Sequence, residues 1–128
     1  MPSNVTLSIS DGTLINNVPY TQGMTARNVL EAAYDMSVNP PTMPQITFWI
    51  DYYGYANQAY LGYIASMING TTAMGNRYWF LYINNTLVNT GIDESVVNSG
   101  DQVMFKYEDY DPGIHSGTII HKIKQASA

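Results

Sequence analysis

The sequence contains no cysteine, and this absence excludes disulfide bridges, thiolate metal sites and cysteine nucleophiles. Basic residues are also scarce, with five Lys and Arg against ten Asp and Glu and a net charge of -5. Such scattered cations offer no positive surface to phosphate backbones, so nucleic-acid binding is not expected. No apolar run approaches the roughly 20 residues of a membrane span, so no span is expected either.

The first four residues are polar and lead directly into alternating apolar and polar residues. A signal peptide would instead begin with basic residues followed by an apolar segment. The sequence therefore predicts synthesis in the cytoplasm, unless a leader has been removed. It leaves the final location open, with a virion or a cell surface among the alternatives.

Charged residues make up only 12% of the chain, about half of the usual share. Tyr, Asn, Ser and Thr must therefore form much of the surface, a composition closer to a protein interface than to the exterior of a free enzyme. This predicts contacts with other protein subunits, in a homo-oligomer or a larger assembly. The 128 residues, 45% of them hydrophobic, suffice for one globular domain.

The first half of the chain predicts a hairpin and then a helix. Alternating apolar residues lead into Asp11-Gly12, a strong hairpin signal in which Ile9 would face Leu14. Thr25 can cap a helix that begins there, and the buried stripe of this helix would be Val29, Leu30 and Ala33.

Further strands are predicted at residues 46–53, 59–69, 78–83 and 102–108. The expected fold is α+β and β-grasp-like, with one helix packed on a mixed β-sheet. The 78–83 strand is bulky on both faces, because Trp79 and Leu81 alternate with Phe80 and its tyrosine neighbours. It is therefore expected to be central, with a helix on one face and another protein or a ligand on the other.

Five short segments resemble, in order, motifs of the C-terminal domain of transcobalamin and its relatives. They are residues 25–33, residues 62–70, residues 78–85, Gly91-Ile92 and Gly100-Asp101. Asn85 stands where the family has a turn glycine, a replacement that tolerates positive φ. The resemblance implies a β-grasp domain and cobalamin as the first ligand to consider. In the animal transporters of this family, the corrinoid is held between this module and a much larger helical domain.

Catalytic and metal-binding motifs are weak, and no catalytic or metal site is expected. His115 and His121 lie outside the compact domain that the motifs predict, and the chain has no Gly-x-Ser-x-Gly elbow. The acidic residues 108–111 are too closely spaced for a calcium loop and are interpreted as a solvated strand end. The chain is therefore not expected to be an enzyme or to hold a cofactor, with cobalamin as the alternative.

Aromatic residues gather on adjacent predicted strands, and about half of them should pack against the helix. The rest would form a binding surface for a protein partner or for a flat small ligand, unless they reflect ordinary strand composition. The candidate binding residues are Trp49, Tyr53, Tyr55, Tyr60, Tyr63, Tyr78 and Tyr82.

The compact domain is predicted to end at residue 111, and residues 112–128 form a tail with unusual apolar character. Ile114, Ile119, Ile120 and Ile123 would belong to a docking strand that pairs with an open sheet edge, in this domain or in a neighbouring subunit. The sequence thus favours an accessory module attached to a larger assembly, such as a virion or cell surface. The alternative is that the aromatic face binds cobalamin or a similar flat ligand.

Overall fold

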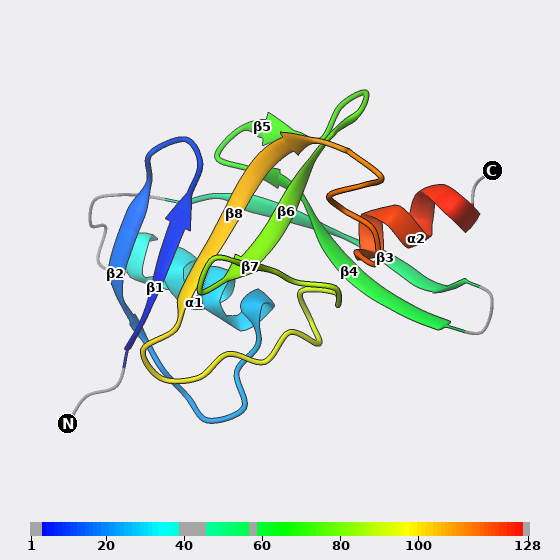
Figure 1. Cartoon of the computed structure of the whole chain (residues 1–128). Helices are drawn as coiled ribbons and strands as arrows, with labels where there is room; N and C mark the ends of the chain where they lie inside the picture. The colour runs from blue at the N-terminus through cyan, green and yellow to red at the C-terminus, as the bar shows by residue number, and fades with distance from the viewer. Residues whose placement is uncertain (1–3, 39–45, 57–58, 127–128) are drawn as a thin grey trace.

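The computed structural model describes residues 4–38, 46–56 and 59–126, in which eight strands form two sheets with a β-grasp-like α+β architecture (Figure 1). The larger sheet has the order β2-β1-β8-β6-β7 and comprises β1 (Asn4–Ile9), β2 (Leu14–Pro19), β6 (Arg77–Ile83), β7 (Thr86–Leu87) and β8 (Gln102–Asp109). The smaller sheet comprises β3 (Phe48–Ala56), β4 (Ala59–Ile68) and β5 (Thr71–Thr72). Because β1 runs parallel to β8 but antiparallel to β2, the larger sheet is mixed, as predicted.

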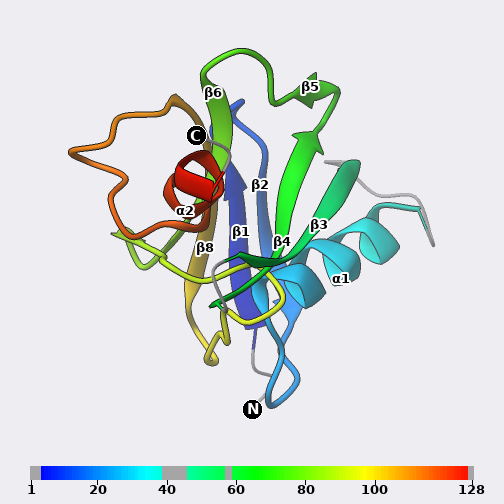
Figure 2. The ribbon, with the colours of Figure 1, turned by 90° about the vertical axis from the view of Figure 1, so that its right-hand side faces the viewer.

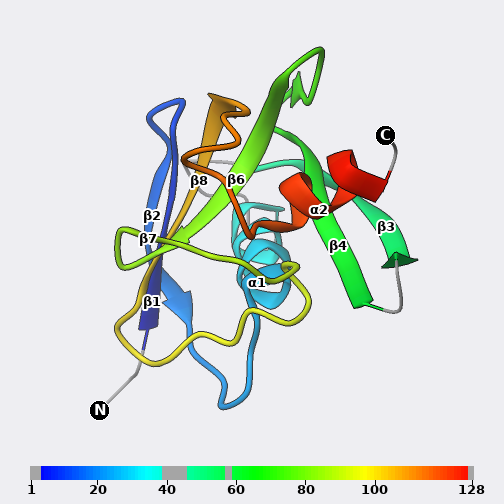
Figure 3. The ribbon, with the colours of Figure 1, turned by 45° about the vertical axis from the view of Figure 1, so that its right-hand side comes forward.

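Two helices, α1 (Ala26–Val38) and α2 (Ile119–Ala126), lie on opposite sides of the larger sheet (Figure 2). Beneath α1, the side chains of Leu7, Val103 and Phe105 are almost completely buried. The β3–β4 hairpin extends away from the larger sheet (Figure 3). Within the part of the chain that is described, neither helix has the length and apolar character needed to cross a membrane.

Helix α1 begins directly after Thr25, as the sequence predicts. The amide of Thr25 donates to Asn28 Oδ1 at 2.9 Å, and the amide of Asn28 donates back to Thr25 Oγ1 at 3.4 Å. This reciprocal cap satisfies amides that the first turn leaves without partners. Val29, Leu30 and Ala33 are buried, which confirms the predicted stripe.

The register of the β1–β2 hairpin differs from the prediction, because Ser8 rather than Ile9 pairs with Leu14. The carboxylate of Asp11 accepts the amide of Thr13 at 2.9 Å, and this side-chain turn makes the connection longer than two residues. As a consequence, Leu14 faces outward and is 49% exposed.

Both faces of β6 are covered, although β8 and not β6 is the central strand. Trp79 and Leu81 belong to the main core under α1, whereas Phe80 packs against Ile119 and Ile120 of α2. The second cover therefore comes from the chain's own carboxyl-terminal segment, not from another protein or a ligand.

The prediction of a docking strand is wrong, because the second half of the tail forms helix α2. Ile119 and Ile120 are 5% and 4% exposed, and Ile123 packs at the margin of the same cluster. Ile114, by contrast, is 65% exposed. Apolar residues at 119, 120 and 123 fit one face of a helix as well as a strand, so their pattern alone was ambiguous.

Candidate functional site

Four tyrosine rings gather on one face of the β3–β4 hairpin, and together they form what we call the tyrosine platform: Tyr52, Tyr55, Tyr60 and Tyr63. The ring centroids of Tyr52 and Tyr63 are 4.8 Å apart. Those of Tyr55 and Tyr60 are 5.0 Å apart, and the two pairs meet where Tyr52 lies 6.4 Å from Tyr60. Rings at these separations attract one another, so the platform is a continuous aromatic surface.

The platform consists of two cross-strand pairs, Tyr52 with Tyr63 and Tyr55 with Tyr60. Between the pairs, Gly54 lies opposite Gly62, and both glycines have positive φ, 62° and 75°. Strict alternation would place Tyr52 and Tyr55, three residues apart, on opposite faces of β3. The irregular pairing around Gly54 restores a common face, as β-bulges do.

Asp93 anchors the platform to the loop that precedes β8. Its Oδ2 accepts the hydroxyl of Tyr60 at 2.8 Å, and its Oδ1 accepts the amide of Tyr63 at 2.9 Å. The hydrogen bond to Asp93, together with partial burial, raises the pKa of the Tyr60 hydroxyl above its usual range. The amide of Ile92 donates to the carbonyl of Tyr63 at 3.0 Å, so the loop is fastened along β4.

Arg27 of α1 closes one end of the platform. Its guanidinium carbon lies 4.7 Å from the ring centroid of Tyr63, and its Nε lies 3.5 Å from Glu31 Oε2. The other end is open, since Tyr52 and Tyr55 are 56% and 69% exposed. The platform is therefore fixed by its neighbours at Tyr60 and Tyr63 and accessible at the other two rings.

The structure brings together only three of the seven predicted binding residues, Tyr55, Tyr60 and Tyr63. Trp49 is 64% exposed and shares a shallow surface hollow with Tyr34 instead. Tyr53 lies near Asp51 and Tyr78, and burial followed by the charge of Asp51 raises the pKa of its hydroxyl.

Sequence reasoning missed three residues of the platform and its supports, Tyr52, Arg27 and Asp93. Alternation along the predicted 46–53 strand places Tyr52 on the same face as Phe48 and Ile50. It is on that side, but β3 extends beyond the core there, so the ring stays exposed. The glycine in the Tyr53-Gly54-Tyr55 sequence was the available signal for a bulge.

Tyr78 and Tyr82, the remaining predicted binding residues, lie in a separate cluster beneath α2. Lys124 of α2 lies over the Tyr78 ring at 5.1 Å, and the Tyr82 hydroxyl donates to Glu108 Oε1 at 2.6 Å. Both side chains are partly buried by the carboxyl-terminal segment and do not join the platform.

The two histidines are part of the domain, which corrects the prediction that they lie outside it. The ring of His115 stacks on Phe80 with centroids 3.7 Å apart and is 2% exposed. The Nδ1 of His115 accepts the amide of Asp111 at 2.8 Å, and the Nδ1 of His121 is 2.6 Å from the hydroxyl of Tyr110. These contacts fasten the carboxyl-terminal segment to the larger sheet.

The Tyr82 hydroxyl predicts a dependence of stability on alkaline pH. Burial and the hydrogen bond to Glu108 raise its pKa above the ordinary value of 10.0. The stabilisation is thus present in full below about pH 10 and is lost as the pH rises toward the folded-state pKa. In urea unfolding near pH 8, we expect Tyr82→Phe to be less stable than the wild type by about 1 kcal/mol.

Above pH 10 this difference should shrink, because the wild type then has to keep the Tyr82 hydroxyl protonated in order to fold, and the variant has no hydroxyl there. Tyr55→Phe, at an exposed ring, is the matched control and should show no such trend. An unchanged difference between wild type and Tyr82→Phe across this range would contradict the assigned role of the hydroxyl.

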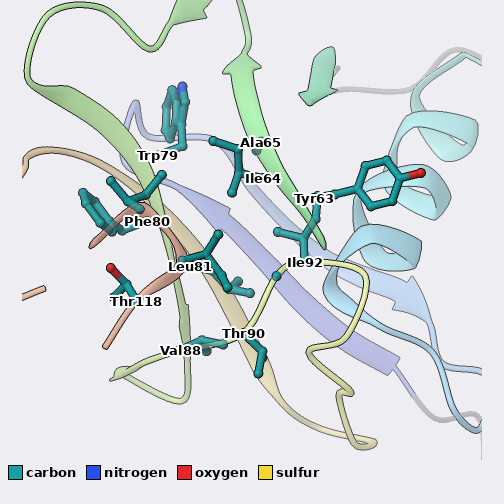
Figure 4. Close-up of a pocket in the computed structure, with 13 residues that line it drawn as sticks. Tyr63, Ile64, Ala65, Trp79, Phe80, Leu81, Val88, Thr90, Ile92 and Thr118 are labelled. Carbon is teal, nitrogen blue, oxygen red and sulfur yellow. The ribbon is translucent and has the colours of Figure 1, made fainter. Parts of the chain in front are cut away.

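A small apolar cavity lies between β4 and β6, lined by residues that include Ile64, Leu81 and Ile92, and Thr118 reaches it from the carboxyl-terminal segment (Figure 4). Its volume is about 30 Å³, which is room for about two water molecules. Tyr63 points away from the cavity, toward α1 (Figure 4). A ligand too large for this cavity must bind at the surface, where the platform is one exposed aromatic site.

No three His, Asp or Glu side chains of the described ranges come together as a potential metal site. The platform itself offers ring faces, phenol hydroxyls and one carboxylate that is already hydrogen bonded. This arrangement suits the recognition of a ligand by stacking and by contact with positive charge.

Comparison with known proteins identifies one family model, Domain of unknown function (DUF4430), which matches residues 46–109, half of the chain. The match includes the whole tyrosine platform and its anchor Asp93. No curated protein matches the chain.

Solved structures resemble the fold, among them haptocorrin and a protein from Ruminococcus gnavus. The structure of haptocorrin in complex with Cbi has a TM-score of 0.63 and 20% identity over 87% of this chain and 26% of that chain. A protein from Ruminococcus gnavus ATCC 29149, described as a candidate metal-binding protein, has a TM-score of 0.53 and 20% identity over 84% of this chain and 95% of that one. The relationship to the transcobalamin C-terminal region is thus a distant one, at the level of fold. This chain spans only about a quarter of the haptocorrin chain.

Proposed function

The chain belongs to the DUF4430 family, and on that premise we propose that it is a non-catalytic binding module that engages its ligand through the tyrosine platform. The observation that carries this proposal is the platform itself, four adjoining rings of which two are more than half exposed. Tyrosine provides apolar area and a polar hydroxyl on a side chain with few rotamers to immobilise, so exposed clusters are typical of binding surfaces. The proposal includes no catalysis and no resident cofactor.

A flat small ligand is the first candidate. The fold that this chain shares with haptocorrin, solved with Cbi, supports it, as does the sequence resemblance to transcobalamin domains. The open rings of Tyr52 and Tyr55 form only one wall, whereas tight binding requires most of the ligand surface to be buried. A second wall would come from another domain or protein, in keeping with a chain that spans a quarter of haptocorrin.

A protein is the second candidate ligand. The openness of the platform and a charged content of only 12% favour it, because protein interfaces are rich in Tyr and depleted of charge at their centres. Attachment to a virion has no support from the fold or from the matched structures.

Titration with cyanocobalamin, followed by calorimetry, tests the first candidate. We expect measurable binding by the wild type and about tenfold weaker binding by the double variant Tyr52→Ala/Tyr55→Ala, because two aromatic contacts of roughly 0.7 kcal/mol each are removed. Trp49→Ala is the matched control, an equally exposed aromatic outside the platform, and should bind as the wild type does. Absence of binding by the wild type would contradict the first candidate, and equal losses in both variants would contradict binding through the platform.

A further inference from the structure

Most of the basic side chains of this protein lie over the face of a tyrosine ring. Four of its five Lys and Arg residues lie over a tyrosine, at 4.6 to 5.2 Å from the ring centroid. The pairs are Arg27 with Tyr63, Arg77 with Tyr107, Lys106 with Tyr82, and Lys124 with both Tyr78 and Tyr110. A cation at this distance is attracted by the negative face of the ring.

The exposed rings of the platform, Tyr52 and Tyr55, differ from the tyrosines that carry a basic side chain. Within the described ranges, no basic side chain lies over Tyr52, Tyr55 or Tyr60. The rings of Tyr52 and Tyr55 are exposed. Arg27 lies over Tyr63, at the other end of the platform from Tyr55. Two exposed rings are thus available to a cation that the chain does not supply.

The charges around the platform also favour a positive partner. Asp93 places a carboxylate against the Tyr60 hydroxyl, and Glu31 pairs with the Arg27 guanidinium at 3.5 Å. The chain as a whole carries a net charge of -5. Approach of a cation is therefore favoured over long range, and approach of an anion is opposed.

We infer that Tyr52 and Tyr55 receive arginine or lysine side chains from a basic segment of a partner protein. A protein segment fits better than a free small cation, because rings that are 56% and 69% exposed form one wall only and do not enclose such a cation by themselves. A segment adds contacts around its own cationic groups. Arginine is the preferred side chain, since its planar guanidinium stacks on aromatic faces. This inference rests on the proposed function, because it uses the same surface.

The test compares two short, end-blocked peptides, one with arginine alternating with glycine and one with citrulline, the neutral isostere of arginine, in its place. At low salt we expect the arginine peptide to bind the intact chain about fivefold more tightly, as measured by calorimetry or by shifts of amide resonances. Tyr55→Leu should weaken that binding about threefold, whereas Tyr55→Phe, which keeps the ring, should leave it nearly unchanged. Thermal unfolding of both variants establishes that each remains folded.

Equal binding of the two peptides, no binding of the arginine peptide, or equal effects of Tyr55→Leu and Tyr55→Phe would overturn the inference. The cyanocobalamin titration is independent of these outcomes. If the wild type binds the corrinoid and Tyr52→Ala/Tyr55→Ala does not, the platform remains a binding surface even when the peptides are not distinguished. If neither the corrinoid nor the arginine peptide binds, the proposed function fails as well.

Discussion

Removal of residues 112–128 is expected to destabilise the whole domain by at least about 5 kcal/mol. The deletion takes away Ile119 and Ile120, which are almost fully buried, and uncovers Phe80, Leu61 and Ile64. Each large apolar side chain gains about 1.5 to 3 kcal/mol from burial, and many small domains have total stabilities of only about 5 to 15 kcal/mol. Urea unfolding, followed by circular dichroism, measures the effect.

A pair of single variants shows whether helix packing is the cause. Ile120→Ala, at a residue that is 4% exposed, should cost about 2 to 5 kcal/mol. Ile114→Ala, at a residue that is 65% exposed in the same segment, should change stability by no more than about 0.5 kcal/mol. The carboxyl-terminal segment is not part of the core if the truncated chain unfolds at the same urea concentration as the wild type. The same conclusion follows if Ile120→Ala and Ile114→Ala lose equal stability.

Gly62→Ala should be the most damaging small change near the tyrosine platform. Gly62 has φ of +75°, and a Cβ atom there would clash with Asp93 Oδ1. The left-handed backbone conformation costs a residue with a side chain about 1 kcal/mol. Displacement of Asp93 would break its bonds to Tyr60 and Tyr63 and cost about 2 kcal/mol more. We expect a total loss of about 3 kcal/mol in urea unfolding, together with weaker ligand binding.

Gly70→Ala is the matched control, because Gly70 has φ of +86° but nothing within 4 Å of its would-be Cβ. It should lose only the backbone part, about 1 kcal/mol. In a Gly62→Ala background, the further change Asp93→Ala should cost less than it does alone, since the contact is already broken. Equal costs of Gly62→Ala and Gly70→Ala would show that Asp93 does not hold β4 in place.

Short-range sequence patterns correctly predicted the features that residues close together in the chain determine, such as the start and the buried face of α1. Thr25 and Asn28 form the cap of α1 within one turn, and Val29, Leu30 and Ala33 repeat at helical spacing, so short-range chemistry sufficed. The mixed sheet followed from the order of strand-like segments and from the family resemblance. The distant solved relatives support that architecture.

Long-range contacts account for what the sequence did not predict. Tyr63 and Asp93 are thirty residues apart, and neither position signals the hydrogen bond that joins them. Tyr52 and Tyr55 share a face only because of the irregular pairing at Gly54, which alternation cannot reveal. Likewise, His115 looked like a residue of a free tail, since its partner Phe80 lies on a strand far earlier in the chain.

Helix α2 was missed for a different reason. It has only eight residues, and its isoleucines fit a strand and a helix equally well when no partner is known. The deciding factor is the exposed face of β6, which Phe80 makes too apolar to be left in water. In the structure, Ile119 and Ile120 pack in the same cluster as Phe80 and cover that face.

The identity of the binding surface is tested most directly by mapping amide chemical shifts of the ¹⁵N-labelled chain during a cyanocobalamin titration. We expect the largest shifts at Tyr52, Tyr55, Tyr60 and Tyr63 of the platform and at Asp93, with little change at Trp49 or in α2. Shifts concentrated in α2, around Trp49, or in the surface hollow that Pro19, Gly23 and Asn28 line between β2 and α1 would place the ligand elsewhere. Any of these results would contradict a binding role for the tyrosine platform.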